Sequence, residues 1–184
     1  MARTASRMLP LGRAIPRFEL LEPLTGRLRA LPEPGSAALV MFVCNHCPYV
    51  VHIRAQLLVV AHRAVDAGIA VVAINANSVA THPEDGPKAM AALASAEGWR
   101  FPFLFDETQE VARTFGAACT PDLFLFGAEG LYYRGQFDDA RPGSPLAVTG
   151  ADLQGAIDSL LAGEAAPADQ WPSLGCNIKG HPER

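Results

Sequence analysis

The feature that most constrains this chain is a pair of cysteines at the junction between an apolar run and a helical segment. Cys44 and Cys47 are separated by two residues, directly after the apolar run 37–43 and directly before a segment with helical periodicity. This spacing lets the two sulfurs close a small ring, and the N-terminus of a following helix favours a thiolate. The pattern indicates thiol–disulfide chemistry, and we interpret the remaining chain as the scaffold of this dithiol.

Length, composition and charge exclude several other classes. A chain of 184 residues can bury roughly 70% of its unfolded surface, so it needs no disulfide staples to fold. Hydrophobic residues make up 49% and charged residues 18%, which is typical of one globular domain. A net charge of −4 without a run of Lys or Arg argues against a nucleic-acid partner, and no apolar stretch reaches membrane-spanning length. Four cysteines suit redox or metal use better than a disulfide scaffold.

The N-terminal segment bears on localisation. Its first 17 residues contain four arginines and no acid, which faintly resembles an organelle transit peptide. Pro10 and Gly12 interrupt this segment, and it lacks a secretory apolar core. We therefore expect a cytoplasmic protein whose residues 1–14 are an irregular lead-in.

Hydrophobic periodicity predicts a strand–helix–strand unit around the cysteines. The helix is expected to begin near Pro48 and to end before Gly68, with one apolar face. The residues expected on that face are Val50, Ile53, Leu57, Val60, Ala61 and Ala64. The apolar run 69–74 then predicts a second strand, parallel to the first and reached by a right-handed crossover.

The rest of the chain adds strands and helices to this unit. Turn residues and alternation predict two hairpins, and caps and periodicity predict three further helices. The expected elements are hairpins over 17–31 and 123–134, a strand over 101–105, a helix with a capping-box spacing at 81–84 and Pro87 near its start, a helix capped by Asp106, and a closing helix over 151–161. This order predicts an α/β domain over residues 15–162, with a mixed central sheet, helices on both faces, an N-terminal β-hairpin extension and an irregular C-terminal tail over 163–184.

Short motifs carry a family resemblance. Cys44-Asn45-His46-Cys47-Pro48 follows a strand, and Cys119-Thr120-Pro121-Asp122 comes just before a hairpin. This combination resembles the thioredoxin fold. The segments FVCNHCPYV, AINAN, GAACTPDLFLF and PSLGCNIK resemble, more narrowly, the peroxiredoxin-like branch of the thioredoxin-like superfamily, the redoxin or AhpC/TSA-type group. The resemblance covers residues 18–161 and the tail cysteine, and it implies a thioredoxin-like fold.

Roles for the two central cysteines follow from their positions. We expect Cys44 to be the exposed nucleophile and Cys47 the resolving thiol, partly covered by the helix. A free thiol titrates near 8.5, and a C-x-x-C motif at a helix N-terminus lowers this pKa to about 7. The same spacing also occurs in zinc sites, but no second pair of ligands with the required spacing follows.

Neighbouring residues are expected to support the dithiol. His46 is similar in position to a histidine in the strongly oxidising relative DsbA, where a donor stabilises the thiolate and raises the reduction potential. The resemblance implies a cis bond between Thr120 and Pro121, facing the dithiol, with Thr120 backbone groups available to an extended partner segment. Pro48 belongs to the same supporting set. Thioredoxin also has a buried carboxylate behind its dithiol, which the 37–43 strand lacks.

Several residues have more than one reading. Glu19 or Asp122 can substitute for the missing carboxylate. Asn75 and Asn77 either line the same end of the sheet as the dithiol or are ordinary turn residues. Cys119 is a further redox thiol, a metal ligand or a small buried hydrophobe. Cys176 is either a resolving thiol reached by movement of the tail or an inert exposed thiol.

The sequence thus favours a thiol–disulfide oxidoreductase that needs no bound cofactor. Its expected partners are protein or small-molecule disulfides and a thiol-based electron donor or acceptor. One alternative is a peroxiredoxin-like thiol peroxidase with antioxidant activity, although Met41 stands where those enzymes place a peroxide-binding Thr relative to Cys44. The other alternative is a metal-binding protein that uses Cys44, Cys47 and Cys119.

Overall fold

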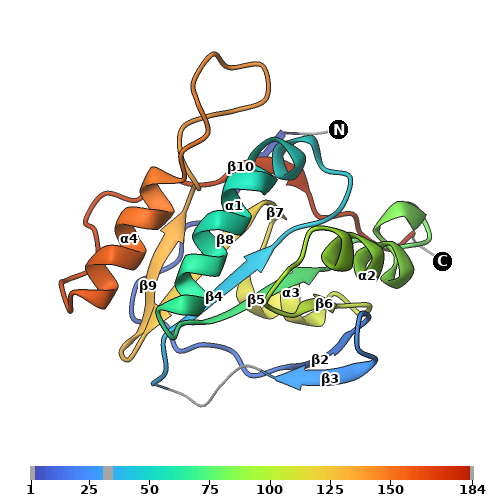
Figure 1. Ribbon diagram of the computed structural model, residues 1–184, viewed down its shortest axis with the longest axis horizontal. Coiled ribbons are helices and arrows are strands. Elements are labelled where there is room, and N and C mark those ends of the chain that lie inside the picture. The colour runs from blue at the N-terminus through green and yellow to red at the C-terminus, as the bar shows by residue number, and fades with distance from the viewer. Residues whose placement is uncertain (1–2, 31–34, 183–184) are drawn as a thin grey trace.

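A mixed seven-stranded sheet forms the centre of the computed structural model, which describes residues 3–30 and 35–182 (Figure 1). The strand order is β3-β2-β6-β5-β4-β8-β9. The strands are β2 (Glu19–Glu22), β3 (Arg27–Ala30), β4 (Ala38–Phe42), β5 (Ala70–Asn75), β6 (Phe103–Phe105), β8 (Asp122–Gly127) and β9 (Gly130–Gly135). Strands β4, β5 and β6 are parallel, and the outer pairs are antiparallel. The predicted parallel pair and both predicted hairpins are confirmed.

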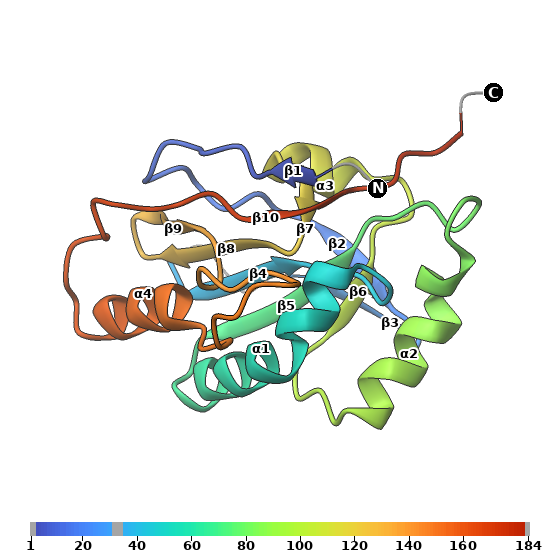
Figure 2. The same ribbon diagram turned by 90° about the horizontal axis from the view of Figure 1, so that it is seen from above.

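Helices cover both faces of this sheet, as predicted. The helices are α1 (Pro48–Asp66), α2 (Pro87–Ala96), α3 (Glu110–Phe115) and α4 (Ala151–Leu161). Figure 2 shows α1, α2 and α4 on one face and α3 with the N-terminal segment on the other. Alternate residues of the buried strand β4 therefore enter two cores: Leu39 and Met41 pack on the α1 side, and Val40 and Phe42 pack on the α3 side.

Helix α1 forms as the sequence indicated. Its buried residues are the six that the periodicity selected. Pro48 occupies the first turn, where its missing N–H is no loss, and Gly68 adopts φ +83° just past the end. The first turn thereby fixes where the helix begins, directly after Cys47.

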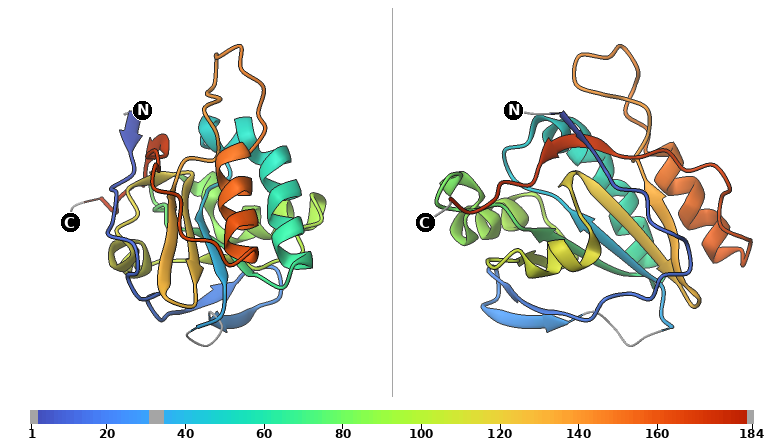
Figure 3. Two further views of the ribbon diagram at one scale, coloured as in Figure 1. Left: turned by 90° about the vertical axis from the view of Figure 1, so that its left-hand side faces the viewer. Right: turned by 180° about the vertical axis from the view of Figure 1, so that it is seen from behind.

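The two ends of the chain are not irregular throughout, which corrects the prediction for the lead-in and the tail. Strand β10 (Leu174–Asn177) lies between β1 (Arg3–Ala5) and β7 (Cys119–Thr120) in a second, three-stranded antiparallel sheet. Figure 3 shows the two terminal segments side by side over the same face. Each of these strands is short, and it is stabilised by pairing with segments distant in the sequence rather than by the strand preference of its own residues.

Two predicted helix caps differ from the structure. Residues 83–85 form the single-turn helix η1 (Pro83–Asp85), and the N-cap of α2 is Gly86, without a side-chain cap. The N-cap of α3 is Gln109, but Asp106 Oδ2 still accepts a hydrogen bond from the Ala112 N–H at 2.8 Å. Residue 31 of the first hairpin and the outermost residues of the lead-in and tail lie outside the described residues. Within the described ranges, no helix combines the length and apolar character that crossing a membrane requires.

Candidate functional site

The two central cysteines lie between the end of β4 and the start of α1. Cys47 is the N-cap residue of α1, so the helix begins after the second cysteine. Both residues are buried, with exposed fractions of 1% for Cys44 and 0% for Cys47. The expectation of an exposed Cys44 is therefore wrong in this structure, because segments distant in the sequence pack against the two sulfurs.

Thr120 faces both sulfurs. Its hydroxyl oxygen lies 3.5 Å from Cys44 Sγ, and its carbonyl oxygen lies 3.1 Å from Cys47 Sγ, placed to accept a hydrogen bond from Cys47 when that thiol is protonated. The Thr120–Pro121 bond is cis, as the resemblance implied. The structure thus brings Cys44, Cys47 and Thr120 together in one buried cluster.

The surroundings of the two sulfurs separate their pKa values. Cys47 Sγ accepts hydrogen bonds from the Cys44 thiol, from the Thr120 hydroxyl and from the backbone N–H groups of Val50 and Cys176, and these lower the pKa of Cys47 to about 4. The pKa of Cys44 is raised, because its proton is held in the bond to Cys47 and because burial and the Asp85 carboxylate oppose a second negative charge. The hydrogen bonds around the pair therefore favour a thiolate at Cys47 over one at Cys44. The physical reason is that the N-terminal amides of α1 reach Cys47 and not Cys44.

This difference predicts an unusual pH dependence of thiol alkylation. With a pKa of about 4, about nine tenths of Cys47 is still thiolate at pH 5, so its alkylation by iodoacetamide should be nearly as fast at pH 5 as at pH 8. An ordinary thiol with a pKa of about 8.5 would slow about a thousandfold over this range. Mass spectrometry of the alkylated peptides measures both rates in one sample. A Cys47 rate that falls in parallel with that of the unfolded protein contradicts the assignment.

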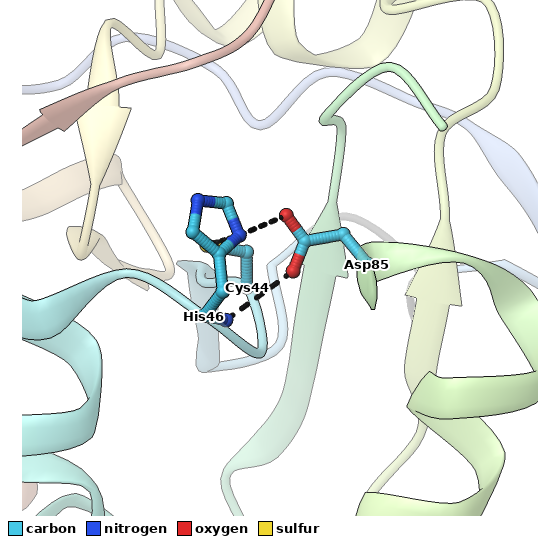
Figure 4. A group of neighbouring side chains, drawn as sticks. All are labelled: Cys44, His46 and Asp85. Atoms are coloured by element: carbon cyan, nitrogen blue, oxygen red, sulfur yellow. Dashed lines mark hydrogen bonds and ion pairs between the residues drawn. The ribbon is translucent and has the colours of Figure 1, made fainter. Parts of the chain in front are cut away.

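A buried carboxylate that the sequence analysis did not select holds the loop between the cysteines. Asp85, with an exposed fraction of 0%, projects from η1 toward the loop (Figure 4). Its Oδ1 accepts hydrogen bonds from the N–H groups of Asn45 at 2.9 Å and His46 at 3.3 Å, and its Oδ2 lies 2.6 Å from His46 Nδ1. Asp85 therefore fixes the backbone and the ring of the residues between the two sulfurs.

The end of β5 positions Asp85. Asn75 donates a hydrogen bond to the Asp85 carbonyl oxygen at 2.7 Å, and Asn77 donates one to Asp85 Oδ2 at 2.8 Å. Asn75 and Asn77 do line this end of the sheet, and their hydrogen bonds hold Asp85 in place. Of the two carboxylates considered from the sequence, Glu19 is exposed on β2, and Asp122 pairs with Arg134 at 3.1 Å. The usable signal was the position of Asp85, shortly after a parallel strand that ends at the same edge of the sheet as β4.

Neutralising Asp85 is expected to loosen this loop. In Asp85→Asn an amide donor replaces an oxygen that faces N–H donors, and we expect a loss of about 2–3 kcal/mol in the free energy of unfolding. We also expect the pKa of Cys44 to fall, since the charge that opposes its thiolate is gone. Chemical denaturation and thiolate absorbance measure the two effects. The control is the neighbouring Glu84→Gln, on a half-exposed side chain, which should stay within about 0.5 kcal/mol.

The His46 ring lies beside Cys44, but its shorter contact is with the Asp85 carboxylate. Its Nδ1 is 3.9 Å from Cys44 Sγ, and its ring stacks on His82 at a centroid distance of 4.8 Å. Cys44, His46 and Asp85 each turn a potential metal-ligand atom toward the others, as do His46, His82 and Glu84. In the first group, the oxygens of Asp85 already accept hydrogen bonds from N–H donors, whereas the buried Nε2 of His46 has no hydrogen-bond partner among the described residues.

The two other predicted thiols lie close to the pair. Cys119 is fully buried, and its Sγ lies 3.5 Å from the Pro121 carbonyl oxygen. Burial and the nearby Asp122 raise the pKa of Cys119, which makes it a small buried hydrophobe in the reduced protein. Cys176 is buried on β10, and its thiol forms a hydrogen bond with Cys47. The expectation that Cys176 is exposed is therefore wrong.

Similar solved structures share this fold over most or all of the chain. An uncharacterized conserved protein from Geobacillus kaustophilus is 42% identical and has a TM-score of 0.95, with 100% of this chain and 99% of that one covered. A hypothetical protein from Sinorhizobium meliloti is 45% identical, with a TM-score of 0.92 and 97% and 98% covered. The thioredoxin domain of a thiol-disulfide oxidoreductase from Bacteroides vulgatus is 18% identical, with a TM-score of 0.61 and 84% and 99% covered, which shows a thioredoxin-like fold.

The sequence comparisons identify the family. No curated protein matches this chain. The model of the AhpC/TSA family matches residues 11–137, a range that includes the cysteine pair, Asp85 and Thr120–Pro121. The resemblance read from the motifs is thereby confirmed at the level of the family and the fold, and the chain belongs to the AhpC/TSA family.

Proposed function

We propose that this protein is a thiol–disulfide oxidoreductase whose redox centre is the Cys44–Cys47 pair. The observation that carries the proposal is the position of the pair: Cys47 is the N-cap of α1, the Thr120 hydroxyl and carbonyl oxygens lie 3.5 Å from Cys44 Sγ and 3.1 Å from Cys47 Sγ, and the hydrogen bonds around Cys47 lower its pKa. A thiolate is the reactive form of cysteine in disulfide exchange. A second thiol, Cys44, is hydrogen-bonded to it.

In this proposal the roles of the two cysteines are the reverse of those read from the sequence. The Cys47 thiolate attacks a partner disulfide, forms a mixed disulfide and releases one partner thiolate. Cys44 then loses its proton and attacks Cys47 Sγ. This step forms the Cys44–Cys47 bond and releases the second partner sulfur, which takes up a proton. Two electrons pass to the partner, and the reverse sequence oxidises a dithiol.

The Cys44 proton is held until it is needed. While Cys47 is a thiolate, the Cys44 thiol donates to it, and the buried charge of Asp85 opposes ionisation of Cys44. Once Cys47 is bonded to a partner, that acceptor is gone. The Thr120 hydroxyl, 3.5 Å from Cys44 Sγ, can then donate to a Cys44 thiolate. This order keeps one sulfur reactive at a time.

The partners and setting follow the same chemistry. We propose protein or small-molecule disulfides as substrates, a thiol-based electron donor or acceptor, and a cytoplasmic location, with no bound cofactor needed for the exchange. His46, Pro48, Thr120 and Pro121 are proposed as supporting residues.

Catalysed reduction of insulin disulfides tests the proposal. With dithiothreitol as the electron source, the wild-type protein should accelerate insulin precipitation in proportion to its concentration. Heat-denatured protein at the same thiol concentration is the control for uncatalysed exchange. The proposal is wrong if the wild-type protein reduces neither insulin nor glutathione disulfide, used as a second substrate, faster than this control.

One observation favours a thiol peroxidase as a second candidate. Two other thiols, Cys44 and Cys176, contact the Cys47 sulfur, so a sulfenic acid formed there by a hydroperoxide would find a thiol in place to condense with. Consumption of hydrogen peroxide at a rate well above that of disulfide reduction, with antioxidant protection as its consequence, would put this candidate first.

A further inference from the structure

The C-terminal strand lies along the backbone that faces the redox centre. In the antiparallel pair of β10 and β7, Cys176 is opposite Thr120 and Asn177 is opposite Cys119. The carbonyl oxygen of Thr120 is the one that lies 3.1 Å from Cys47 Sγ. Extended partner segments bind proteins by adding a strand to such an edge. Here the chain's own β10 occupies the edge next to the two sulfurs.

The fit of β10 to this edge is close at one residue. A Cβ at Gly175 would lie 2.0 Å from the Thr120 carbonyl oxygen and 3.2 Å from the Pro121 nitrogen. Both contacts are with backbone, so no flexible side chain can give way. Glycine before the cysteine is therefore what allows the strand to lie directly on the Thr120–Pro121 peptide.

The strand also brings a sulfur to the centre. The Cys176 thiol donates a hydrogen bond to Cys47 Sγ, and the Cys176 N–H donates to the same atom. Burial and the bond to Cys47 raise the pKa of Cys176 to about 11, so its proton stays in that bond. Further along the tail, the Lys179 N–H donates to Asn77 Oδ1 at 2.8 Å, which anchors the segment beyond the cysteine.

We propose that β10 is a built-in partner segment of the redox centre and that Cys176 exchanges a disulfide bond with Cys47. In the oxidised centre, Cys176 loses its proton and attacks Cys47 Sγ, the Cys44–Cys47 bond breaks, and Cys44 leaves as a thiolate and takes up the proton. One disulfide is consumed and one is formed, so no oxidant is needed. An external substrate of the same kind is an extended polypeptide with a small residue before its reactive cysteine, and it must displace β10.

Disulfide mapping in Cys44→Ser tests whether Cys176 forms a disulfide with Cys47 when Cys44, the competing thiol, is absent. This variant keeps Cys47, Cys119 and Cys176, which trypsin places on three separate peptides. Diamide, a diazene that takes up two electrons and two protons, should join the peptides of Cys47 and Cys176 within one molecule. A bond to Cys119, bonds between molecules only, or free thiols throughout would overturn the proposal.

Matched variants control for folding and for chance proximity. Cys44→Ser/Cys119→Ser should give the same bond in the same yield, and Cys44→Ser/Cys176→Ser should give no intramolecular bond. Adding Gly175→Ala to Cys44→Ser should lower the initial rate of bond formation about five- to tenfold, because the new methyl group pushes β10 off Thr120. An unchanged rate in a folded Gly175→Ala protein contradicts the role of the strand.

The wild-type protein provides a test that does not depend on any substitution. Equilibrated in glutathione buffers and quenched with acid, it should contain a fraction with Cys47 joined to Cys176 and with Cys44 free. This inference rests on the proposed function, yet the two can fail separately. If the protein reduces insulin while Cys176 always stays free, only the exchange with Cys176 is wrong. If the Cys47–Cys176 bond forms but the protein turns over no disulfide substrate, only the proposed oxidoreductase function is wrong.

Discussion

Cys47→Ser is expected to abolish disulfide reduction, lowering the rate by about a thousandfold or more, because the variant lacks the attacking thiolate. Cys44→Ser/Cys176→Ser is expected to keep the first step and to stall afterwards, with the partner covalently bound to Cys47, because neither neighbouring thiol is left to displace it. Non-reducing electrophoresis after mixing each variant with a protein disulfide distinguishes the two outcomes. The adduct should form with Cys44→Ser/Cys176→Ser and be absent with Cys47→Ser.

The control for this pair is Cys119→Ser, which removes a nearby buried sulfur whose thiol donates a hydrogen bond to the Pro121 carbonyl oxygen. It should keep most of the activity if it remains folded, as judged by its thermal transition. The opposite pattern, an adduct trapped on Cys44 in Cys47→Ser, would restore the order of roles that the sequence indicated. That order placed the nucleophile first in the motif.

The start of the helix shows what the sequence did and did not contain. Pro48 after Cys47 is a strong signal for the first helical position, and the apolar spacing from Val50 to Ala64 selected the buried face of α1 correctly. Both are local properties, which a sequence expresses directly. Combined strictly, they make Cys47 the N-cap, so the position of the second cysteine at the helix N-terminus was within reach of the sequence. The burial of both sulfurs was not, because residues from other elements provide it.

Asp85 and β10 illustrate the non-local part. The Asp85 carboxylate reaches the Asn45 and His46 amides only because β4 and β5 are adjacent and parallel, so that the segments after them meet at one edge. The topology was predictable from the sequence. Which residue after β5 would place its side chain against the loop between the cysteines was not. Strand β10 is four residues long and pairs with segments more than fifty residues away, β1 and β7. Its sequence, Leu-Gly-Cys-Asn, has little strand preference of its own, so only the partners order it.

Arg134→Met is expected to destabilise the protein by about 3–5 kcal/mol, because it leaves the buried Asp122 carboxylate without its partner. Both side chains have an exposed fraction of 0%, and Arg134 Nη2 lies 3.1 Å from Asp122 Oδ2. The guanidinium also lies 3.9 Å from the centroid of the Phe124 ring. Urea denaturation measures the loss. Arg63→Met is the matched control, since its pair with Asp158 is about half exposed and should be worth less than about 1 kcal/mol.

The pH dependence of this loss has a definite sign. Burial raises the pKa of Asp122 to about 6 even with Arg134 present, above the value of about 3.9 for an unfolded aspartate. A raised carboxyl pKa favours the folded state at low pH, and this contribution is lost as the pH rises through the folded-state value. Without Arg134 the folded-state pKa rises further, so the Arg134→Met deficit should be larger at pH 8 than at pH 5.

Asp122 also ties this pair to the redox centre. Its Oδ2 accepts a hydrogen bond from the Ala118 N–H at 3.0 Å, directly before the Cys119–Thr120 strand that faces the two sulfurs. Adding Asp122→Asn to Arg134→Met removes the unpaired charge and keeps an acceptor for Ala118, so it should recover about half of the lost stability. A double variant no more stable than Arg134→Met at pH 8 would mean that packing on Phe124, rather than the charge of Asp122, makes Arg134 indispensable.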